Sequence, residues 1–164
     1  MIRLHLITTH TPDGPFYMIA DEQDVVRVSG FGAVSDLEAR LPAASADHIL
    51  EALEAHPYQR HILDYYAGVP NALDAILRAQ IGSPFQEKVW SAISAIPYGK
   101  TMTYKQLAQA AGNPAAVRAA GTICGRNRLI LLVPCHRVLK SDGSIGSYLY
   151  GPTLKKSLLD RERS

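Results

Sequence analysis

The chain places a cysteine beside a histidine in the run Pro134-Cys135-His136-Arg137-Val138. A cysteine is a strong nucleophile only as its thiolate, so it requires a base, a cation or a helix N-terminus nearby. His136 is a candidate base, and Pro134 restricts the backbone that carries the thiol. Neighbours in sequence often point apart, so the elements around this run decide whether the pair is reactive.

Composition limits what the chain can be. Its 164 residues, 47% of them hydrophobic, suffice for one large domain or two small ones. No apolar run approaches the roughly 18 residues of a membrane span, and Arg3 and His5 interrupt the first apolar stretch, so we expect neither a span nor a signal peptide. The 2 cysteines do not make a disulfide framework. We therefore expect an intracellular location, where a free thiol survives.

The charge is unevenly distributed. Residues 1–81 carry 5 Lys/Arg and 11 Asp/Glu, a net charge of −6, whereas residues 82–164 carry 12 Lys/Arg and 4 Asp/Glu, a net charge of +8. This split suggests that only the second half meets a polyanion such as nucleic acid. Chance asymmetry of a solvated surface is the alternative.

The first half reads as a small strand-and-helix domain. Residues 2–8, 15–20 and 25–29 predict an antiparallel meander of strands. A helix is expected next, ended by Pro57, and then a second helical piece that ends at Gly68. Apolar spacing supports the first helix at Ala46, Ile49, Leu50 and Leu53, and the second at Ile62, Leu63 and Tyr66. Residues 72–78 are expected to form another strand, and residues 81–82 a domain boundary.

The second half begins with a helix signal. Ser83 is a candidate N-cap, Pro84 suits the first helical position, and Gln86 completes a capping box. After a turn at residues 97–100, two short helices are expected over residues 104–111 and 115–124, the first capped by Thr103. Because residues 112–114 break the pair with a glycine and a proline, the pattern is that of a helix-turn-helix.

The second of these helices is rich in alanine, and Arg118 is its one long side chain. Such a helix can approach another surface closely and carry its arginine into a nucleic-acid groove. An ordinary core helix with Arg118 in solvent fits the same pattern.

Five stretches together resemble the O6-alkylguanine-DNA alkyltransferases, the methylated-DNA–protein-cysteine methyltransferases, in family order and spacing. They are Phe85-Gln86-Glu87-Lys88-Val89-Trp90, Ile96-Pro97-Tyr98-Gly99-Lys100-Thr101, Thr103-Tyr104-Lys105-Gln106-Leu107-Ala108, Arg118-Ala119-Ala120-Gly121 and Pro134-Cys135-His136-Arg137-Val138. The resemblance is strong over residues 83–162. It implies an α+β chain: residues 1–80 would form a ribonuclease-H-like domain of structural or regulatory role, and residues 83–164 a mainly helical domain for DNA binding and alkyl transfer.

The resemblance implies a single irreversible reaction. Cys135 would take the alkyl group from the O6 oxygen of guanine by in-line displacement, leaving a thioether and a spent protein. His136 would act as the base and Glu162 would orient it. Tyr104 would donate a proton or hydrogen bond to the departing guanine, and Asn127 would support the hinge before the site. No cofactor or metal is expected.

The resemblance also implies how DNA is held. The nucleotide would leave the stack of double-stranded DNA while the helix-turn-helix docks in the minor groove with little sequence specificity, and Arg118 would fill the gap. The other residues expected at DNA are Thr103, Tyr104, Ala115, Ala119, Gly121, Arg126 and Arg128. The protein is expected to act as a monomer, with clustering along DNA as the alternative, and to be nucleoid-associated in a prokaryote.

Three positions depart from the family pattern. Arg128 stands where the family usually has proline, which would loosen the turn or add a phosphate contact. Leu149 and Tyr150 stand where the family has small residues, so we expect an alkyl pocket formed by Val138, Tyr148, Leu149 and Tyr150 to restrict large groups. The first half has no cysteine, so a zinc site of some relatives would lack thiolate ligands.

Three other functions account for these residues less well. A non-catalytic lesion-binding protein of the alkyltransferase-like type would lack Cys135. A Cys-His hydrolase would need an oxyanion hole, for which no motif is present. A plain helix-turn-helix regulator leaves Cys135, His136 and Tyr104 unexplained.

Overall fold

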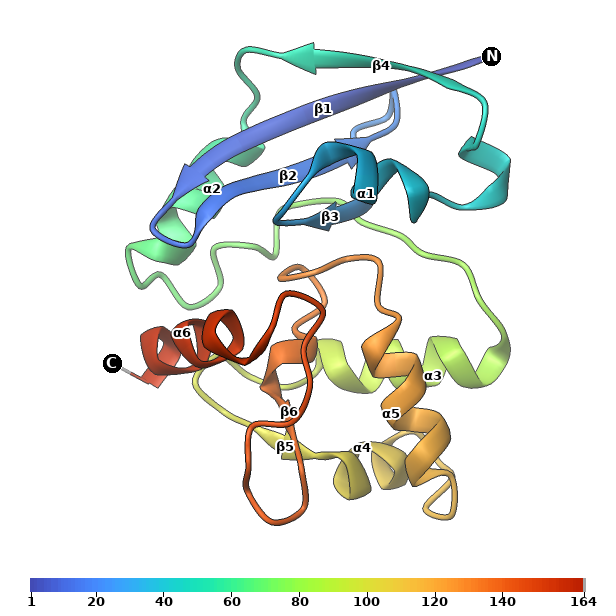
Figure 1. The fold of residues 1–164 in the computed structure, drawn as a ribbon, viewed down its shortest axis with the longest axis vertical. Helices are drawn as coiled ribbons and strands as arrows, with labels where there is room; N and C mark the ends of the chain where they lie inside the picture. Colours follow the sequence, from blue (N-terminus) through green and yellow to red (C-terminus); the bar gives the residue numbers. More distant parts are fainter. Residues whose placement is uncertain (164) are drawn as a thin grey trace. The chain divides into compact units, whose positions relative to one another are not determined.

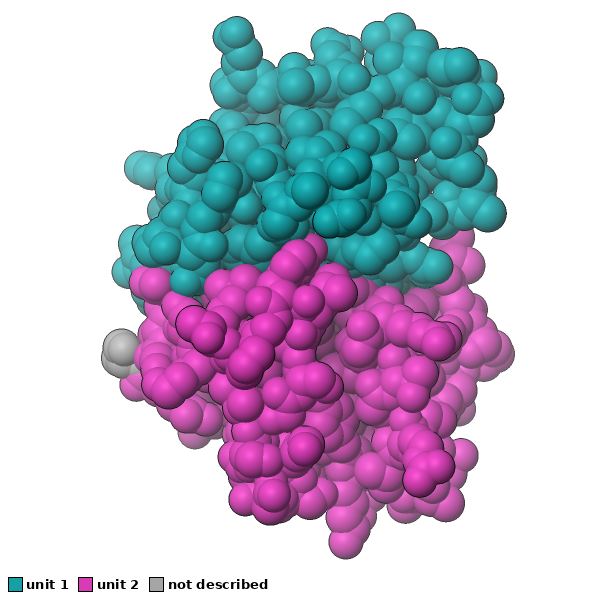
Figure 2. Space-filling view, viewed as in Figure 1, with its two compact units in different colours: residues 1–80, 128–132 teal, residues 81–127, 133–164 magenta. Residues whose placement is uncertain are grey.

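The computed structural model describes residues 1–163 (Figure 1). The chain forms two compact units, which Figure 2 colours separately. Unit 1 contains residues 1–80 and 128–132, and unit 2 contains the remaining described residues. Segment 128–132 joins unit 1 because the Ser29 amide donates to the Arg128 carbonyl (3.0 Å) and the Ser29 hydroxyl donates to the Ile130 carbonyl (2.7 Å).

Unit 1 is built on a four-stranded sheet of order β3-β2-β1-β4 (Figure 1). Its strands are β1 (Ile2–Thr11), β2 (Gly14–Ala20), β3 (Val26–Gly30) and β4 (His48–Leu53). β1 and β2 pair antiparallel, as do β2 and β3, so the predicted meander is confirmed. One face of the sheet buries Leu4, Ile19 and Val28 with Leu37 of α1 (Val34–Ala39), which supplies the apolar contact that a sheet requires.

The helix predicted around residues 46–53 is wrong, because this segment forms the 3-10 turn η1 (Ala43–Ser45) followed by β4. β4 pairs in parallel with β1, placing Leu50 opposite Leu4. Apolar residues at three- and four-residue spacing fit a short edge strand as well as a helix, and tertiary pairing chose the strand. The strand predicted over residues 72–78 is also wrong. This segment forms turns, and its Leu73 and Ile76 side chains are buried. An isolated bridge between Arg78 and Val26 pairs its end with β3.

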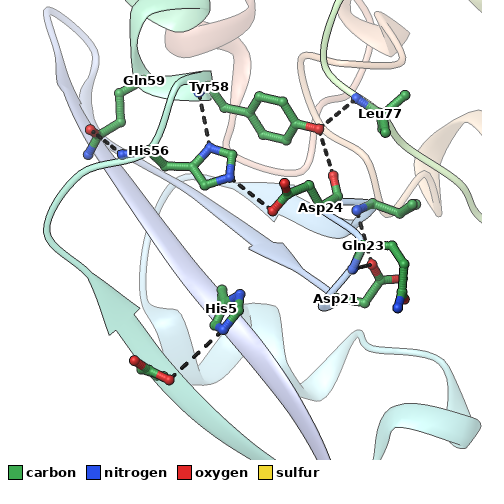
Figure 3. A network of polar contacts seen from close by, with 10 residues as sticks. His5, Asp21, Gln23, Asp24, His56, Tyr58, Gln59 and Leu77 are labelled. Atoms are coloured by element: carbon green, nitrogen blue, oxygen red, sulfur yellow. Dashed lines mark hydrogen bonds and ion pairs between the residues drawn. The ribbon is translucent and has the colours of Figure 1, made fainter.

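The predicted second helix is present as α2 (Tyr58–Tyr66), with Ile62 and Tyr65 buried. A polar network fixes the loop before it (Figure 3). The Tyr58 amide donates to Nδ1 of His56 (3.1 Å), so the His56 Nε2–H faces Asp24 (3.1 Å). The Tyr58 hydroxyl donates to the Asp24 carbonyl (2.7 Å) and accepts from the Leu77 amide (3.2 Å). This network ties the β2–β3 turn, the start of α2 and residue 77 together.

Unit 2 is mainly helical, with a two-stranded parallel sheet. Its elements are α3 (Pro84–Ser94), β5 (Met102–Thr103), α4 (Tyr104–Ala110), α5 (Val117–Gly125), the 3-10 turn η2 (Cys135–Arg137), β6 (Val138–Leu139) and α6 (Pro152–Arg163). The capping box of Ser83 and Gln86 is confirmed, and Thr103 forms a second one with Gln106. α3, α4 and α5 pack against one another, which confirms the two predicted short helices. β5 pairs with β6, so the strand before Tyr104 lies beside the strand after Cys135.

Within residues 1–163, every helix is too short or too polar to cross a bilayer. The same residues contain no cluster of three or more His, Cys, Asp or Glu side chains arranged to hold a metal ion.

Candidate active site

Cys135 begins η2 and follows a buried apolar run. Its amide donates to the Val133 carbonyl (2.8 Å), and the Arg137 amide donates to the Pro134 carbonyl (2.9 Å). The residue is only 5% exposed. The thiol is therefore held in a tight turn, largely shielded from water.

His136, the next residue in η2, is fully buried and pairs with Glu162 on α6. Its Nε2 lies 2.7 Å from Glu162 Oε2. A carboxylate only accepts, so Nε2 carries the proton and Nδ1 carries the lone pair. Burial holds the pKa of His136 below its usual range even though Glu162 opposes this shift. Nδ1 is buried and meets no hydrogen-bond partner among the described residues. It is a neutral base with an open acceptor site.

Glu162 is held ionised although it is buried. Burial alone would raise its pKa, but hydrogen bonds from His136 and Arg137, together with the charge of Arg137, lower the pKa of Glu162 to about 2. Arg137 contacts both carboxylate oxygens, with Nε 2.8 Å from Oε1 and Nη2 3.2 Å from Oε2. Its Nη1 donates to the Ile96 carbonyl (2.8 Å). Sequence reasoning did not assign Arg137 to the site, although a cation within the reactive motif could have suggested it.

The surroundings of the Cys135 sulfur lower its pKa. The first cause is a hydrogen bond from the Cys124 thiol; burial opposes it, while Asn127 and Lys155 assist it. The Asn127 amide donates to the Val133 carbonyl (2.8 Å) and so joins the two ends of segment 128–132. Lys155 is fully buried on α6, and its ammonium donates to the carbonyls of Val138 (2.7 Å) and Ser147 (3.2 Å). Sequence reasoning missed both Cys124 and Lys155 as site residues.

Tyr104 is the first residue of α4 and is half-buried. Burial, together with the negative charge that the Cys124–Cys135 pair carries as a thiolate, raises the pKa of Tyr104 to about 12. Gly121 and Gly146 lie against its ring: a Cβ on Gly121 would be 3.6 Å from Cδ1, and one on Gly146 would be 3.4 Å from Oη. The phenol therefore stays protonated and can donate a hydrogen bond.

Most residues predicted at DNA lie in or beside α4 and α5 and are at least partly exposed. Ala115, Arg118, Ala119 and Arg126 are exposed, while Thr103 and Gly121 are half-buried. The other side of α5 buries Ala120 and Cys124. Arg128 differs from this group because it belongs to unit 1, where its Nε donates to the Arg40 carbonyl (3.0 Å).

The residues predicted to form the alkyl pocket flank the Cys135 turn in sequence. Val138 is fully buried in β6, and Leu149 is 50% exposed. The rings of Tyr148 and Tyr150 meet edge to face with their centroids 6.2 Å apart.

Comparison with known proteins places this chain in a family. Residues 84–164 match the family described as "6-O-methylguanine DNA methyltransferase, DNA binding domain". The chain is 35% identical over 166 residues to the methylated-DNA–protein-cysteine methyltransferase of Salmonella typhimurium, covering 99% of this chain and 97% of the relative. It is 38% identical over 132 residues to the bifunctional transcriptional activator/DNA repair enzyme Ada of Escherichia coli, spanning 79% of this chain but 36% of Ada.

Solved structures of proteins from the same family also resemble this chain. The O6-methylguanine methyltransferase of Mycobacterium tuberculosis, as its R37L variant, superposes with a TM-score of 0.81 at 28% identity, covering 98% of this chain and 93% of the other. The M. tuberculosis protein in complex with DNA gives a TM-score of 0.77 at 28% identity, over 97% and 92% of the two chains. These likenesses extend through both units, and they confirm the mixed α+β class. The chain therefore belongs to the methylated-DNA–protein-cysteine methyltransferases, as the motifs around Cys135 predict.

Proposed function

We propose that this chain repairs DNA by moving a methyl or other alkyl group from O6 of guanine to the Cys135 sulfur. A sulfur–carbon bond forms as the carbon–O6 bond breaks, and the electron pair of that bond stays on guanine. The observation that carries this proposal is the buried His136–Glu162 pair beside Cys135, with Nδ1 of His136 open to accept a proton.

The side chains divide the reaction between them. The thiol proton passes to His136 Nδ1 through a bridging water, and Glu162 stabilises the imidazolium that results. Tyr104 donates a hydrogen bond to the guanine as negative charge develops on it. No later step removes the alkyl group from the Cys135 thioether, so each protein molecule reacts once.

DNA binding is proposed for the exposed side of α4 and α5. Its small side chains suit close approach to a minor groove, and the net charge of +8 over residues 82–164 suits phosphate contacts. The M. tuberculosis relative has been solved with DNA. We further propose that the chain acts as a monomer associated with the nucleoid, and that unit 1 is a ribonuclease-H-like domain of structural or regulatory role.

Mass spectrometry tests the reaction. The protein is incubated with duplex DNA that contains O6-methylguanine, and the peptide containing Cys135 is expected to gain one methyl group. DNA that contains guanine at the same position is the control. Retained DNA binding without any methyl gain would instead favour a non-catalytic lesion-binding protein.

Arg118→Ala is expected to slow repair of duplex DNA by about 10- to 100-fold, because unstacking a nucleotide costs a few kcal/mol that the arginine would offset. Reaction with the free base O6-methylguanine should change little. Arg126→Ala is the matched control. It should lower the affinity for DNA and reduce the salt slope of binding by about one. The ratio of the transfer rate from duplex DNA to the transfer rate from the free base should stay unchanged. An equal loss on both substrates for Arg118→Ala would contradict the finger role.

Leu149 and Tyr150 are expected to make O6-benzylguanine a poor substrate, about tenfold slower than O6-methylguanine, because bulky side chains narrow the pocket. Single-turnover rates with the two modified DNAs measure this ratio, and Leu149→Gly should bring the two rates closer. Equal or faster benzyl transfer by the unaltered protein would remove the explanation.

A further inference from the structure

A second thiol contacts the turn of the proposed nucleophile. Cys124 lies in the last turn of α5 and is 4% exposed. Its thiol donates to the Cys135 carbonyl across 3.8 Å, a contact that joins α5 to η2. Both cysteines are free thiols. The turn that holds Cys135 therefore abuts a sulfur–hydrogen donor that the reaction described above does not use.

A thiolate at Cys135 requires hydrogen-bond donors, because water can reach little of it and burial penalises its charge. The Asn127 amide and the Lys155 ammonium favour this thiolate, but both also donate to main-chain carbonyls at 2.7–3.2 Å. The Cys124 thiol makes a long contact, 3.8 Å, with the Cys135 carbonyl. Its S–H rotates about a single bond, so it can turn to the neighbouring sulfur at little cost.

The two thiols are unequal acids. Their mutual hydrogen bond lowers the pKa of Cys135 and raises the pKa of Cys124 well above its usual range. A pair that shares one negative charge places it on the member that accepts the hydrogen bond. Cys135 consequently loses its proton first, and Cys124 stays protonated as the donor.

We propose that Cys124 is a positioning residue for alkyl transfer, whose S–H donates to the Cys135 sulfur and orients it as the Cys135 proton leaves. This inference rests on the proposed function. No bond to Cys124 breaks and it keeps its own proton. Once Cys135 is a thioether, its sulfur is a weak acceptor, and the Cys124 thiol returns to the carbonyl.

The test compares Cys124→Ala with Cys124→Ser in single-turnover methyl transfer from O6-methylguanine duplex, between about pH 6 and about pH 10. A reductant keeps both thiols reduced. Cys124→Ala should be about three- to tenfold slower near neutral pH, the equivalent of one modest hydrogen bond, and should approach the wild-type rate at high pH, where the thiolate forms without help. Cys124→Ser should keep most of the rate because its hydroxyl also donates.

The other titratable groups at the site are unchanged in both variants. Lys155 favours the thiolate by its charge, Tyr104 remains a protonated phenol at these pH values, and His136 is the proton acceptor. If the pH profile of the transfer rate shifts in Cys124→Ala but not in Cys124→Ser, the shift is therefore due to loss of the hydrogen-bond donor at position 124.

Val89→Ala supplies a packing control, because Val89 is fully buried on α3 of the same unit. It should lower thermal stability without moving the pH profile. A profile for Cys124→Ala that overlays the wild type, or that is lowered equally at every pH, would reduce Cys124 to a packing residue.

A second readout separates this proposal from the proposed function. The rate at which iodoacetamide alkylates Cys135, followed by mass spectrometry across the same pH range, needs no DNA. If O6-methylguanine DNA never methylates the wild type, the proposed function fails, yet the Cys124→Ala shift in iodoacetamide reactivity still tests the donor. If methylation occurs and neither profile shifts, only the role of Cys124 fails.

Discussion

Cys135→Ala is expected to abolish alkyl transfer while DNA binding stays near the wild-type level. The substitution removes the atom that forms the new bond. The Cys124 thiol is a poor replacement, because its burial on α5 still raises its pKa when Cys135 is absent. Removing a nucleophile from a catalytic group of this kind costs about 10⁴-fold or more. Single-turnover transfer of a labelled methyl group from O6-methylguanine DNA measures the loss.

The control for this result is Cys124→Ser, which removes the other cysteine and should still accept methyl on Cys135. Fluorescence anisotropy with the modified duplex reports binding for both variants. Binding that falls as severely as transfer in Cys135→Ala would contradict the division between an exposed DNA surface and a buried reaction centre.

Glu162→Gln is expected to impair both stability and transfer. Its carboxylate accepts from His136 and from two nitrogens of Arg137, all of them buried. Breaking a buried ion pair leaves an uncompensated charge at a cost of about 3–5 kcal/mol. The amide can also face His136 with its NH₂ group, which would favour the wrong tautomer. Urea unfolding is expected to show the loss of stability, and the transfer rate should fall by about 10²- to 10⁴-fold.

The pH dependence of stability gives an independent check on Glu162. Its pKa is about 2 in the folded chain, against about 4.3 in an unfolded one. The ionised side chain therefore stabilises the fold fully above about pH 4.3, and this contribution, roughly 3 kcal/mol, is lost as the pH falls to about 2. Between about pH 4.3 and about 2, Glu162→Gln should therefore lose roughly 3 kcal/mol less of its free energy of unfolding than the wild type does.

Asp160→Asn is the matched control, because Asp160 is exposed on the same helix and pairs with Lys156 at the surface. Surface pairs of this kind contribute about 0–1 kcal/mol, so its unfolding should stay close to that of the wild type. Parallel stability curves for the wild type and Glu162→Gln between about pH 4.3 and about 2 would show that Glu162 is not held ionised by its partners.

Local signals in the sequence sufficed where the interacting groups are close along the chain. The capping box of Ser83 with Gln86 joins residues three apart, and Thr103 caps the helix that begins at the next residue, so both signals can be recognised within a short stretch of sequence. The alternating strands of the meander and the two short helices were predicted for the same reason. The family was also evident, because the reactive Cys135-His136 run and its flanking stretches keep their order and spacing.

Tertiary structure decided what depends on distant partners. β4 is a strand because β1 lies beside it, and segment 128–132 belongs to unit 1 because Ser29 bonds to it. At the site, the side chains of Arg137 and Glu162 meet across 25 residues, and the Lys155 ammonium meets the Val138 carbonyl across 17. Burial and charged partners change the pH at which a given carboxylate, imidazole or thiol ionises. A sequence can therefore name the sulfur, the imidazole and the carboxylate, but only the folded chain determines which of them is ionised and which atom is left to accept the proton.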